Sequence, residues 1–340
     1  MPSDAVPLEF AALEARSAEM DALAAVTPGI DRFCSGAAWT LAAREAFAPD
    51  AEPVIVHDNA GMIALMRTVT PEGVPLLAPL EASWGLACPL LGAAAEPIAA
   101  RLAALAATPP NDRLPLVLMG MPRLGPALAA VLVALGKRRV VRPAPDTVRV
   151  IAELPDGVDA YLDARGAHFR TAVRRAERAA AREGLELEIV DPTTAEAALA
   201  LIDRAIDVEA QSWKGLSGTG LAGVELEAFT RGLVRRIAPG GTLRGIVLKQ
   251  GDADVGFILG AVTGTTYRGL QASFAAPLRR LSPGMLLHVA MMRRLAAEGV
   301  TRYDLGSDMP YKRRWGEPGL VTCSLVAVPR LGAGASRGSR

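Results

Sequence analysis

Three strand-like segments follow one another between residues 242 and 274, and they constrain the fold more than any other part of the chain. They read TLRGIVLKQ (242–250), DVGFILGAV (254–262) and TYRGLQASF (266–274), with short Gly- and Asp-containing turns between them. Connections this short join antiparallel neighbours, because parallel strands need a crossover of a dozen or more residues. A helical pattern at 284–298 and a strand RYDLG at 302–306 come next. The pattern predicts an α/β (α+β mixed sheet) fold, in which a largely antiparallel sheet is flanked by helices.

The N-terminal half shows the same order of elements, which indicates an internal duplication. We predict helices at 7–25, 37–47, 95–107 and 123–136, a hairpin of strands 52–58 and 62–69, and strands at 74–80, 114–120 and within 139–153. After Leu154-Pro155-Asp156-Gly157 the pattern starts again, with a helix at 158–183, a strand at 185–190, a helix at 194–213 and a last strand at 320–328. The predicted domains are 1–153 and 154–330. Residues 331–340, rich in Gly, Ser and Arg, are expected to be a disordered tail.

The charge balance limits the kinds of partner. A net charge of +1 gives no overall field that would recruit DNA, RNA or anionic lipid, so any anion site must be local. Cys34, Cys88 and Cys323 are widely spaced, which predicts small core residues rather than disulfides or a metal site. The N-terminus lacks a basic signal-peptide region, and no apolar run is long enough to span a bilayer. We expect a cytoplasmic protein with no transmembrane segment and no metal.

The segment before the helix at 284–298 is a candidate anion site. Ser282 is a good N-cap and Pro283 suits the first helical turn, while Gly284 leaves room for a close backbone approach. Free N–H groups at a helix start bind phosphates well, and Arg279 and Arg280 stand beside this one. A capped helix preceded by arginines is also a common structural feature, so both interpretations stay open.

The C-terminal half resembles a known family. Arg279-x-x-Ser282-x-Gly284 is similar to the Q/R-x-x-G-x-G/A pyrophosphate loop of GNAT acyltransferases, with Ser in place of the first Gly. Three motifs of residues 165–317 resemble the FemAB-like, CelD-like branch of that superfamily. They are S-P-G-M-L-L (282–287), D-L-G (304–306) and Y-K-R-R-W (311–315). The resemblance implies two tandem GNAT-like domains, of which the N-terminal one matches more loosely. It also implies binding of acetyl-CoA or another acyl-CoA by Arg279, Arg280, Ser282, Gly284 and Met285.

The segment LGSDMPYKRRWGE (305–317) follows the strand that, in this family, splays from its neighbour. The resemblance therefore places Asp308, Tyr311 and Lys312 near the thioester or the acceptor, with Tyr311 donating a proton to the leaving thiolate. Lys312 and Arg313 would hold an acidic acceptor or the phosphates of the donor, and Trp315 would contact the substrate. The alternative is a basic loop with Trp315 as a hydrophobic plug.

Two further regions carry candidate residues. EAQSWKG (209–215) ends a predicted helix, where Trp213 would line an acceptor cleft or lie in the core. Glu209 would act as a general base only if burial raised its pKa, and its position alone favours a surface carboxylate. Arg174 belongs to a stripe of arginines at four-residue spacing. That stripe is either a solvated face or a basic wall for an anionic ligand.

The leading functional hypothesis is a GNAT-type N- or O-acyltransferase, using acyl-CoA and a small-molecule or envelope-precursor acceptor, without DNA. Direct attack by the acceptor needs positioning and proton transfer but no covalent nucleophile. One alternative is a FemAB-type transferase that uses aminoacyl-tRNA. The other is a non-catalytic binding protein in an envelope or polysaccharide pathway.

Overall fold

The computed structural model describes residues 8–218 and 220–330, so the expected tail at 331–340 lies outside the described residues. The chain divides into two compact units. Unit 1 holds the described residues up to Thr147 and from Leu320 onward, and unit 2 spans Val148–Gly319. The break in the chain is close to the predicted border at 153. Residues 320–330, expected in the C-terminal domain, belong instead to unit 1, because strand β12 (Glu317–Pro329) pairs with β5 (Leu116–Pro122) there.

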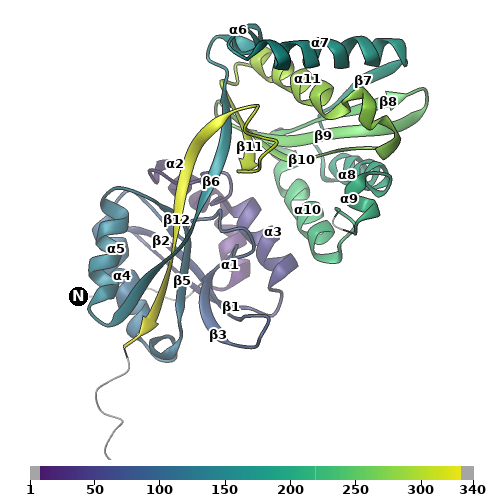
Figure 1. The fold of residues 1–340 in the computed structure, drawn as a ribbon. Coiled ribbons are helices and arrows are strands. Elements are labelled where there is room, and N and C mark those ends of the chain that lie inside the picture. The colour runs from purple at the N-terminus through teal and green to yellow at the C-terminus, as the bar shows by residue number, and fades with distance from the viewer. Residues whose placement is uncertain (1–7, 219, 331–340) are drawn as a thin grey trace, which may run out of the picture. The chain divides into compact units, whose positions relative to one another are not determined.

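Unit 1 is a mixed sheet with helices on both faces (Figure 1). Its helices are α1 (Phe10–Ala15), α2 (Ser17–Val26), α3 (Ala37–Phe47), α4 (Ala95–Ala107), η1 (Asn111–Arg113) and α5 (Pro126–Gly136). Its strands are β1 (Glu52–Asp58), β2 (Gly61–Val69), β3 (Pro75–Pro79), β4 (Leu90–Leu91), β5, the first part of β6 (Arg139–Glu153), and β12. The strand order is β1-β2-β3-β5-β12-β6, with β4 beside β2. The predicted hairpin is confirmed, since Asp58 faces Gly61 across a two-residue turn.

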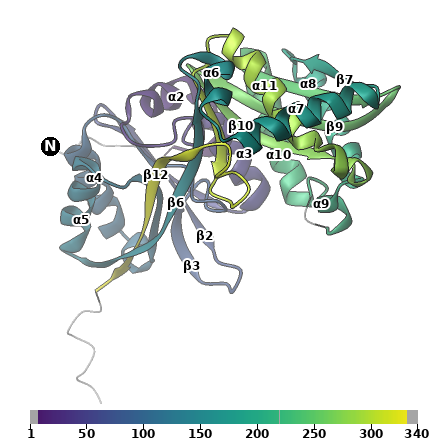
Figure 2. The ribbon, with the colours of Figure 1, turned by 45° about the horizontal axis from the view of Figure 1, so that its top comes forward.

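Unit 2 has the order β6-β11-β10-β9-β8-β7. Its strands after β6 are β7 (Leu185–Val190), β8 (Leu243–Gln250), β9 (Ala253–Thr263), β10 (Thr266–Phe274) and β11 (Arg302–Ser307). Its helices are α6 (Gly157–Asp163), α7 (Ala167–Arg182), α8 (Ala195–Ala210), α9 (Trp213–Leu216), α10 (Val224–Ile237), η2 (Ala238–Gly240), η3 (Ala276–Leu281) and α11 (Pro283–Ala297). Helices α7 and α11 cover one face of this sheet, and α8 and α10 cover the other (Figures 1 and 2).

Several predicted helices are divided in the structure. The helix expected at 7–25 breaks at Arg16, which leaves helical geometry between α1 and α2. The helix expected at 158–183 breaks before α7, where Gly166 is extended. The helix expected at 194–213 ends at Ala210, and α9 begins a separate turn capped by Ser212. Helix α10 was not predicted, although its acidic first turn and basic last turn are typical helix signals.

The same β-α-β arrangement occurs in both units and confirms the predicted fold class. In unit 2, β10 and β11 are parallel neighbours joined through α11. In unit 1, β3 and β5 are parallel neighbours joined through α4. All other pairings with a printed register are antiparallel. The chain is therefore a mixed α/β protein with two tandem units of related topology, each a largely antiparallel sheet flanked by helices.

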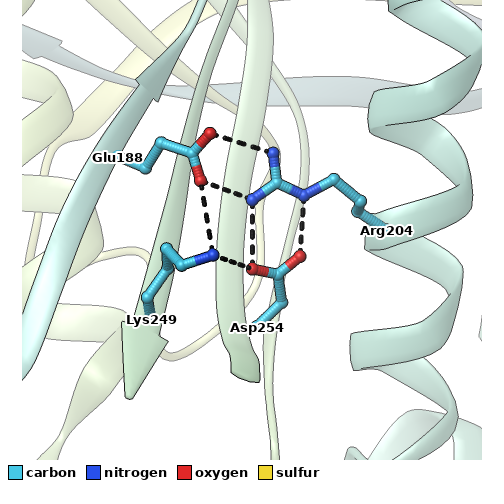
Figure 3. A network of polar contacts seen from close by, with 4 residues as sticks. All are labelled: Glu188, Arg204, Lys249 and Asp254. Atoms are coloured by element: carbon cyan, nitrogen blue, oxygen red, sulfur yellow. Dashed lines mark hydrogen bonds and ion pairs between the residues drawn. The ribbon is translucent and has the colours of Figure 1, made fainter. Parts of the chain in front are cut away.

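A network of polar contacts connects helix α8 to the sheet of unit 2 (Figure 3). The guanidinium of Arg204 donates to Asp254 at 2.7 and 3.0 Å and to Glu188 at 2.5 and 3.2 Å. Lys249 Nζ lies 3.5 Å from Asp254. These contacts hold the pKa values of Glu188 and Asp254 below their usual range, with the hydrogen bond from Arg204 as the largest cause. Arg204 on α8 thus joins β7 and β9, and Lys249 on β8, the strand between them, contacts the same two carboxylates.

Each unit has its own apolar core. The core of unit 1 includes Leu65, Leu77 and Leu116, and that of unit 2 includes Leu248, Leu287 and Leu295, each 0% exposed. The three cysteines are free and buried, as predicted. In the part of the chain that the structure describes, no helix is long and apolar enough to cross a bilayer.

Candidate active site

The parallel pair β10–β11 is short, and the two strands stop pairing near the centre of unit 2. Their register runs only from Thr266 opposite Arg302 to Arg268 opposite Asp304. Immediately beyond, the pairing of β10 with β9 shifts register between Gly269 and Gln271. A bulge interrupts the ladder and turns the strand locally. The last residues of β11 and the segment that follows, up to residue 317, therefore have no pairing with β10.

A buried charge cluster lies at this point. Arg149 donates to the carboxylate of Asp304 at 2.6 Å, and Arg268 Nη1 lies 3.7 Å from the same carboxylate. All three side chains are at most 9% exposed. Asp304 also accepts from the backbone N–H of Gly306 at 2.7 Å. A Cβ at residue 306 would lie 2.8 Å from Arg268 Nη1, so the glycine makes room for the guanidinium. Two guanidinium groups and one carboxylate therefore lie together in the interior.

Lys312 completes this electropositive region. Its Nζ donates to the backbone carbonyl of Ser307 at 3.1 Å. Burial, together with the positive charges of Arg268 and Arg149, lowers the pKa of Lys312 to about 8 against the opposing effect of Asp304. A lysine in this range carries a proton most of the time at pH 7 but can release it, as a general acid or base must.

Tyr311 lies next to this lysine. It is 52% exposed, and the centre of its ring is 5.7 Å from Lys312 Nζ. Partial burial raises the pKa of the Tyr311 phenol above 10. The phenol therefore stays protonated near neutral pH and has a proton to donate.

Asp308 and Arg313 form an exposed ion pair with one another. Arg313 donates to both Asp308 oxygens, at 2.9 and 2.7 Å. The hydrogen bond from Arg313 lowers the pKa of Asp308, so this carboxylate is a weak proton acceptor. Arg313 in turn already has an anionic partner. The pair closes the turn that presents Tyr311 and Lys312.

Trp315 is a core residue, which corrects its expected contact with substrate. The side chain is 1% exposed and packs on Phe169 and His288, with ring centres 5.0 and 4.9 Å away. Tyr161 donates to its carbonyl oxygen at 2.5 Å. Burial lowers the pKa of His288 to about 4, so its imidazole is neutral. Trp315 anchors the far end of the loop, as the hydrophobic-plug interpretation predicts.

Glu209 is buried, contrary to the expected surface carboxylate. It is 2% exposed, lies 3.3 Å from Lys214 Nζ, and accepts a short hydrogen bond from the backbone N–H of Leu221. These contacts engage both carboxylate oxygens of Glu209 and hold the loop after α8. Lys214, which sequence reasoning missed, also donates to the backbone carbonyl of Ala272 on β10, at 3.1 Å. Trp213 is 64% exposed beside it.

The turn before α11 differs from the predicted N-cap. Ser282 has φ 58° and ψ 51°, the left-handed region, and its side chain makes no capping hydrogen bond. Its carbonyl instead accepts from the N–H of Met285 at 3.0 Å. The family pattern has Gly at this position, and a positive φ is the physical reason for that preference. Pro283 opens the helix as predicted.

Two cations flank this turn. Arg279 and Arg280 are exposed and form no ion pair with the described residues. A Cβ at Gly284 would lie 3.5 Å from the ring of Phe274, so this face of the turn is close to β10. The Met285 side chain is 4% exposed and lies in the core, and its N–H is bonded to Ser282.

Three of the four arginines in the stripe predicted on α7 are exposed, and the fourth, Arg170, is partly buried. Arg170 donates to the backbone carbonyls of Asp163 and Arg165, at 2.9 and 2.5 Å. Arg174, Arg178 and Arg182 are exposed and form no ion pair within residues 8–218 and 220–330. Helix α7 packs on α11 and contacts η3, which carries Arg279 and Arg280.

Part of the sequence matches a known protein family. A family model described as an acetyltransferase (GNAT) domain matches residues 167–313. No curated protein matches the sequence.

Solved structures are similar over nearly the whole chain. A conserved protein of unknown function from Bacteroides thetaiotaomicron VPI-5482 has a TM-score of 0.62 and 13% identity, covering 96% of this chain and 99% of that one. FemX has a TM-score of 0.61 and 12% identity, covering 92% and 96%. The C-terminal domain of a putative lysylphosphatidylglycerol synthetase from Agrobacterium fabrum has a TM-score of 0.50 and 14% identity, covering 85% and 91%. At these identities the similarity establishes the fold alone. The segment from α7 to the loop after β11, which holds most of the candidate site, matches the GNAT acetyltransferase domain.

Proposed function

We propose that unit 2 transfers an acyl group from an acyl-CoA to an amine or hydroxyl acceptor by direct attack. The single observation that supports this most is the position of Tyr311 and Lys312. They follow β11 where it stops pairing with β10, and the pKa of Lys312 is lowered to about 8. The match of residues 167–313 to a GNAT acetyltransferase model supports the same reaction class.

In this proposal the donor's diphosphate binds at the start of α11. Arg279 and Arg280 supply exposed positive charge, and the backbone N–H of Gly284 supplies a donor at the helix start. Pro283 has no N–H, and the N–H of Met285 already donates to the carbonyl of Ser282, whose left-handed conformation turns the chain here. The donor would then extend along the uncovered edge of β10 toward Tyr311.

The proposed chemistry moves two protons. The acceptor nitrogen or oxygen attacks the thioester carbonyl carbon and loses a proton to neutral Lys312, while the C–S bond breaks. The leaving thiolate takes the proton of Tyr311. The negative charge that develops on the carbonyl oxygen is stabilised by the protonated phenol of Tyr311, which donates toward the reacting group. The exposed Trp213 offers an apolar surface to the acceptor.

Isothermal titration calorimetry with acetyl-CoA and longer acyl-CoAs tests the proposal. We expect binding by the full chain and a loss of at least about tenfold in Arg279→Ala/Arg280→Ala, since two charged contacts are removed. Arg113→Ala, which removes an exposed arginine of unit 1, is the matched control and should bind normally. Tyr311→Phe should bind the donor normally and turn over more slowly. No binding of any acyl-CoA would overturn the proposal.

One observation favours a second candidate, an aminoacyl-tRNA donor. Arg174, Arg178 and Arg182 span eight residues of α7, about 12 Å at 1.5 Å per residue, beside the arginines of η3. A ladder of this length suits successive phosphodiesters of an RNA strand. Binding of tRNA that weakens steeply with added salt, and in Arg174→Ala/Arg178→Ala, would favour this donor over coenzyme A.

A further inference from the structure

Helix α5 of unit 1 is apolar on every side. Residues 124–136, LGPALAAVLVALG, contain no charged side chain and no side chain that forms hydrogen bonds. Its inner face, with Val131 and Leu135 at 1 and 2% exposure, packs into the core of unit 1 and against α4. A surface helix normally turns polar residues outward, and a helix without a polar face is normally covered all round. The outer face of α5 breaks this rule.

That outer face is exposed. Ala129, Leu132 and Val133 share one stripe of the helix, and Leu132 and Val133 are 40 and 66% exposed. Leu124, just before the helix, is 81% exposed. Large apolar side chains grouped on one surface indicate a site of contact with another apolar phase.

Cations border this apolar face at the C-terminal end of α5. Lys137 and Arg138 are exposed and form no ion pair with the described residues. The chain has no acidic residue from 113 to 145. A hollow of about 400 Å³ opens beside Lys137 and Arg138 between the ends of α4 and α5, with Asp112 as the acidic residue in its lining.

Arg330 adds a cation at the same place. Its backbone N–H donates to the carbonyl of Arg138 at 3.1 Å, and its guanidinium donates to the carbonyl of Gly136, the last residue of α5, at 3.1 Å. The Arg330 side chain is exposed, so its charge has the same sign as that of Lys137 and Arg138 at the border of the apolar face.

We propose that the outer face of α5 docks unit 1 on an anionic lipid surface. Leu124, Leu132 and Val133 enter the boundary between headgroups and acyl chains, and Lys137, Arg138 and Arg330 contact anionic headgroups. Eleven residues of helix measure about 16 Å, which is shorter than a bilayer core. The helix consequently lies along the surface.

The charge beside the outer face of α5 favours an anionic lipid surface over a second copy of the chain as its partner. A two-fold dimer would present the same patch from both partners, so cations would meet a surface rich in cations. Anionic headgroups instead complement the apolar stripe and its basic border together.

Flotation of the full chain with vesicles tests this proposal. We expect binding to vesicles of phosphatidylglycerol and phosphatidylcholine, and at least tenfold less binding to phosphatidylcholine alone. Val133→Glu, and separately Leu124→Ser, should each reduce binding several-fold, and Lys137→Glu/Arg138→Glu about fivefold per charge removed. Val69→Glu replaces an equally exposed valine (61%) of unit 1 away from α5, and should bind like the parent.

Circular dichroism establishes that each variant is folded, and Leu124→Ser lies outside the helix, so its fold is the least at risk. The proposal is overturned if the parent does not bind anionic vesicles, or if Leu124→Ser binds them as well as the parent does. It is equally overturned if sizing shows a dimer that Val133→Glu dissociates, since α5 would then be an interface between copies.

Discussion

The guanidinium of Arg149 on β6 donates to the carboxylate of Asp304 on β11 at 2.6 Å, with the two side chains 1 and 9% exposed. Ion pairs this deeply buried contribute little net stability as a pair, but removing one partner is costly. Arg268 shares the same carboxylate from β10. Three strands thus meet through one acidic residue, directly before the segment that carries Tyr311 and Lys312.

Asp304→Asn should lower the free energy of unfolding by about 3 kcal/mol, because it removes the negative charge beside two buried guanidinium groups. Urea denaturation at pH 7 measures this. Glu153→Gln is the matched control. It breaks an exposed pair with Arg302 on the same two strands, 3.0 Å apart, and should cost less than about 1 kcal/mol. Equal losses in the two variants would contradict the importance of burial here.

Arg204→Met should destabilise unit 2 by about 1 to 2 kcal/mol at pH 7, because two carboxylates lose their charged donor. The pKa values of Glu188 and Asp254 are lowered in the fold, so their contribution is present above their unfolded values of 4.5 and 3.8. It is lost as pH falls through the folded values. Unfolding measured from pH 7 to pH 3 should therefore show the difference between parent and variant shrinking at low pH. A difference that stays constant over this range would argue against the network as its source.

The rate of acyl transfer should rise with pH and level off above about 8, because neutral Lys312 is the proton acceptor in the proposed reaction. Lys312→Arg keeps the charge but cannot lose it, so kcat should fall by about 100-fold and the rise near pH 8 should disappear. Arg314→Lys, an exposed cation two residues further on, serves as the control. Stopped-time assays from pH 6 to pH 9.5 give the profile. A flat profile in the parent chain would remove Lys312 from the chemistry.

Ser282→Gly should leave stability unchanged or raise it by up to about 1 kcal/mol, since glycine adopts a positive φ without a steric penalty. Ser282→Val should cost about 1 to 2 kcal/mol, because a β-branched side chain fits this conformation poorly. Thermal unfolding distinguishes the two, and the KM for acyl-CoA should rise only in the valine variant. If Ser282→Gly raised KM instead, the serine hydroxyl would contribute to binding.

Much of the fold of unit 2 follows from local patterns. Strands 242–274 alternate in polarity and are separated by short turns, and each appears in the structure within a residue or two of its predicted limits. Pro283 correctly marks the start of α11. Helix α10 was missed although Phe229, Leu233 and Ile237 recur at helical spacing and are buried. The separation of α6 from α7 and the pairing of residues 320–330 with unit 1 depend on distant contacts that no local pattern records.

The sequence by itself determined the mixed sheet, the helix start at 283 and the candidate segment 305–317, because these depend on residues within one or two turns of each other. Only the tertiary structure decided which of the candidate side chains are accessible. Trp315 and Glu209 turned out to be buried, and Asp308 to be paired with Arg313. The lowered pKa of Lys312 also required the fold, since burial and the charges of Arg149 and Arg268 produce it. Two strands, β6 and β10, and the turn after β11 bring residues 149, 268 and 312 together, and the pKa of Lys312 depends on the distances between them and on the exclusion of water.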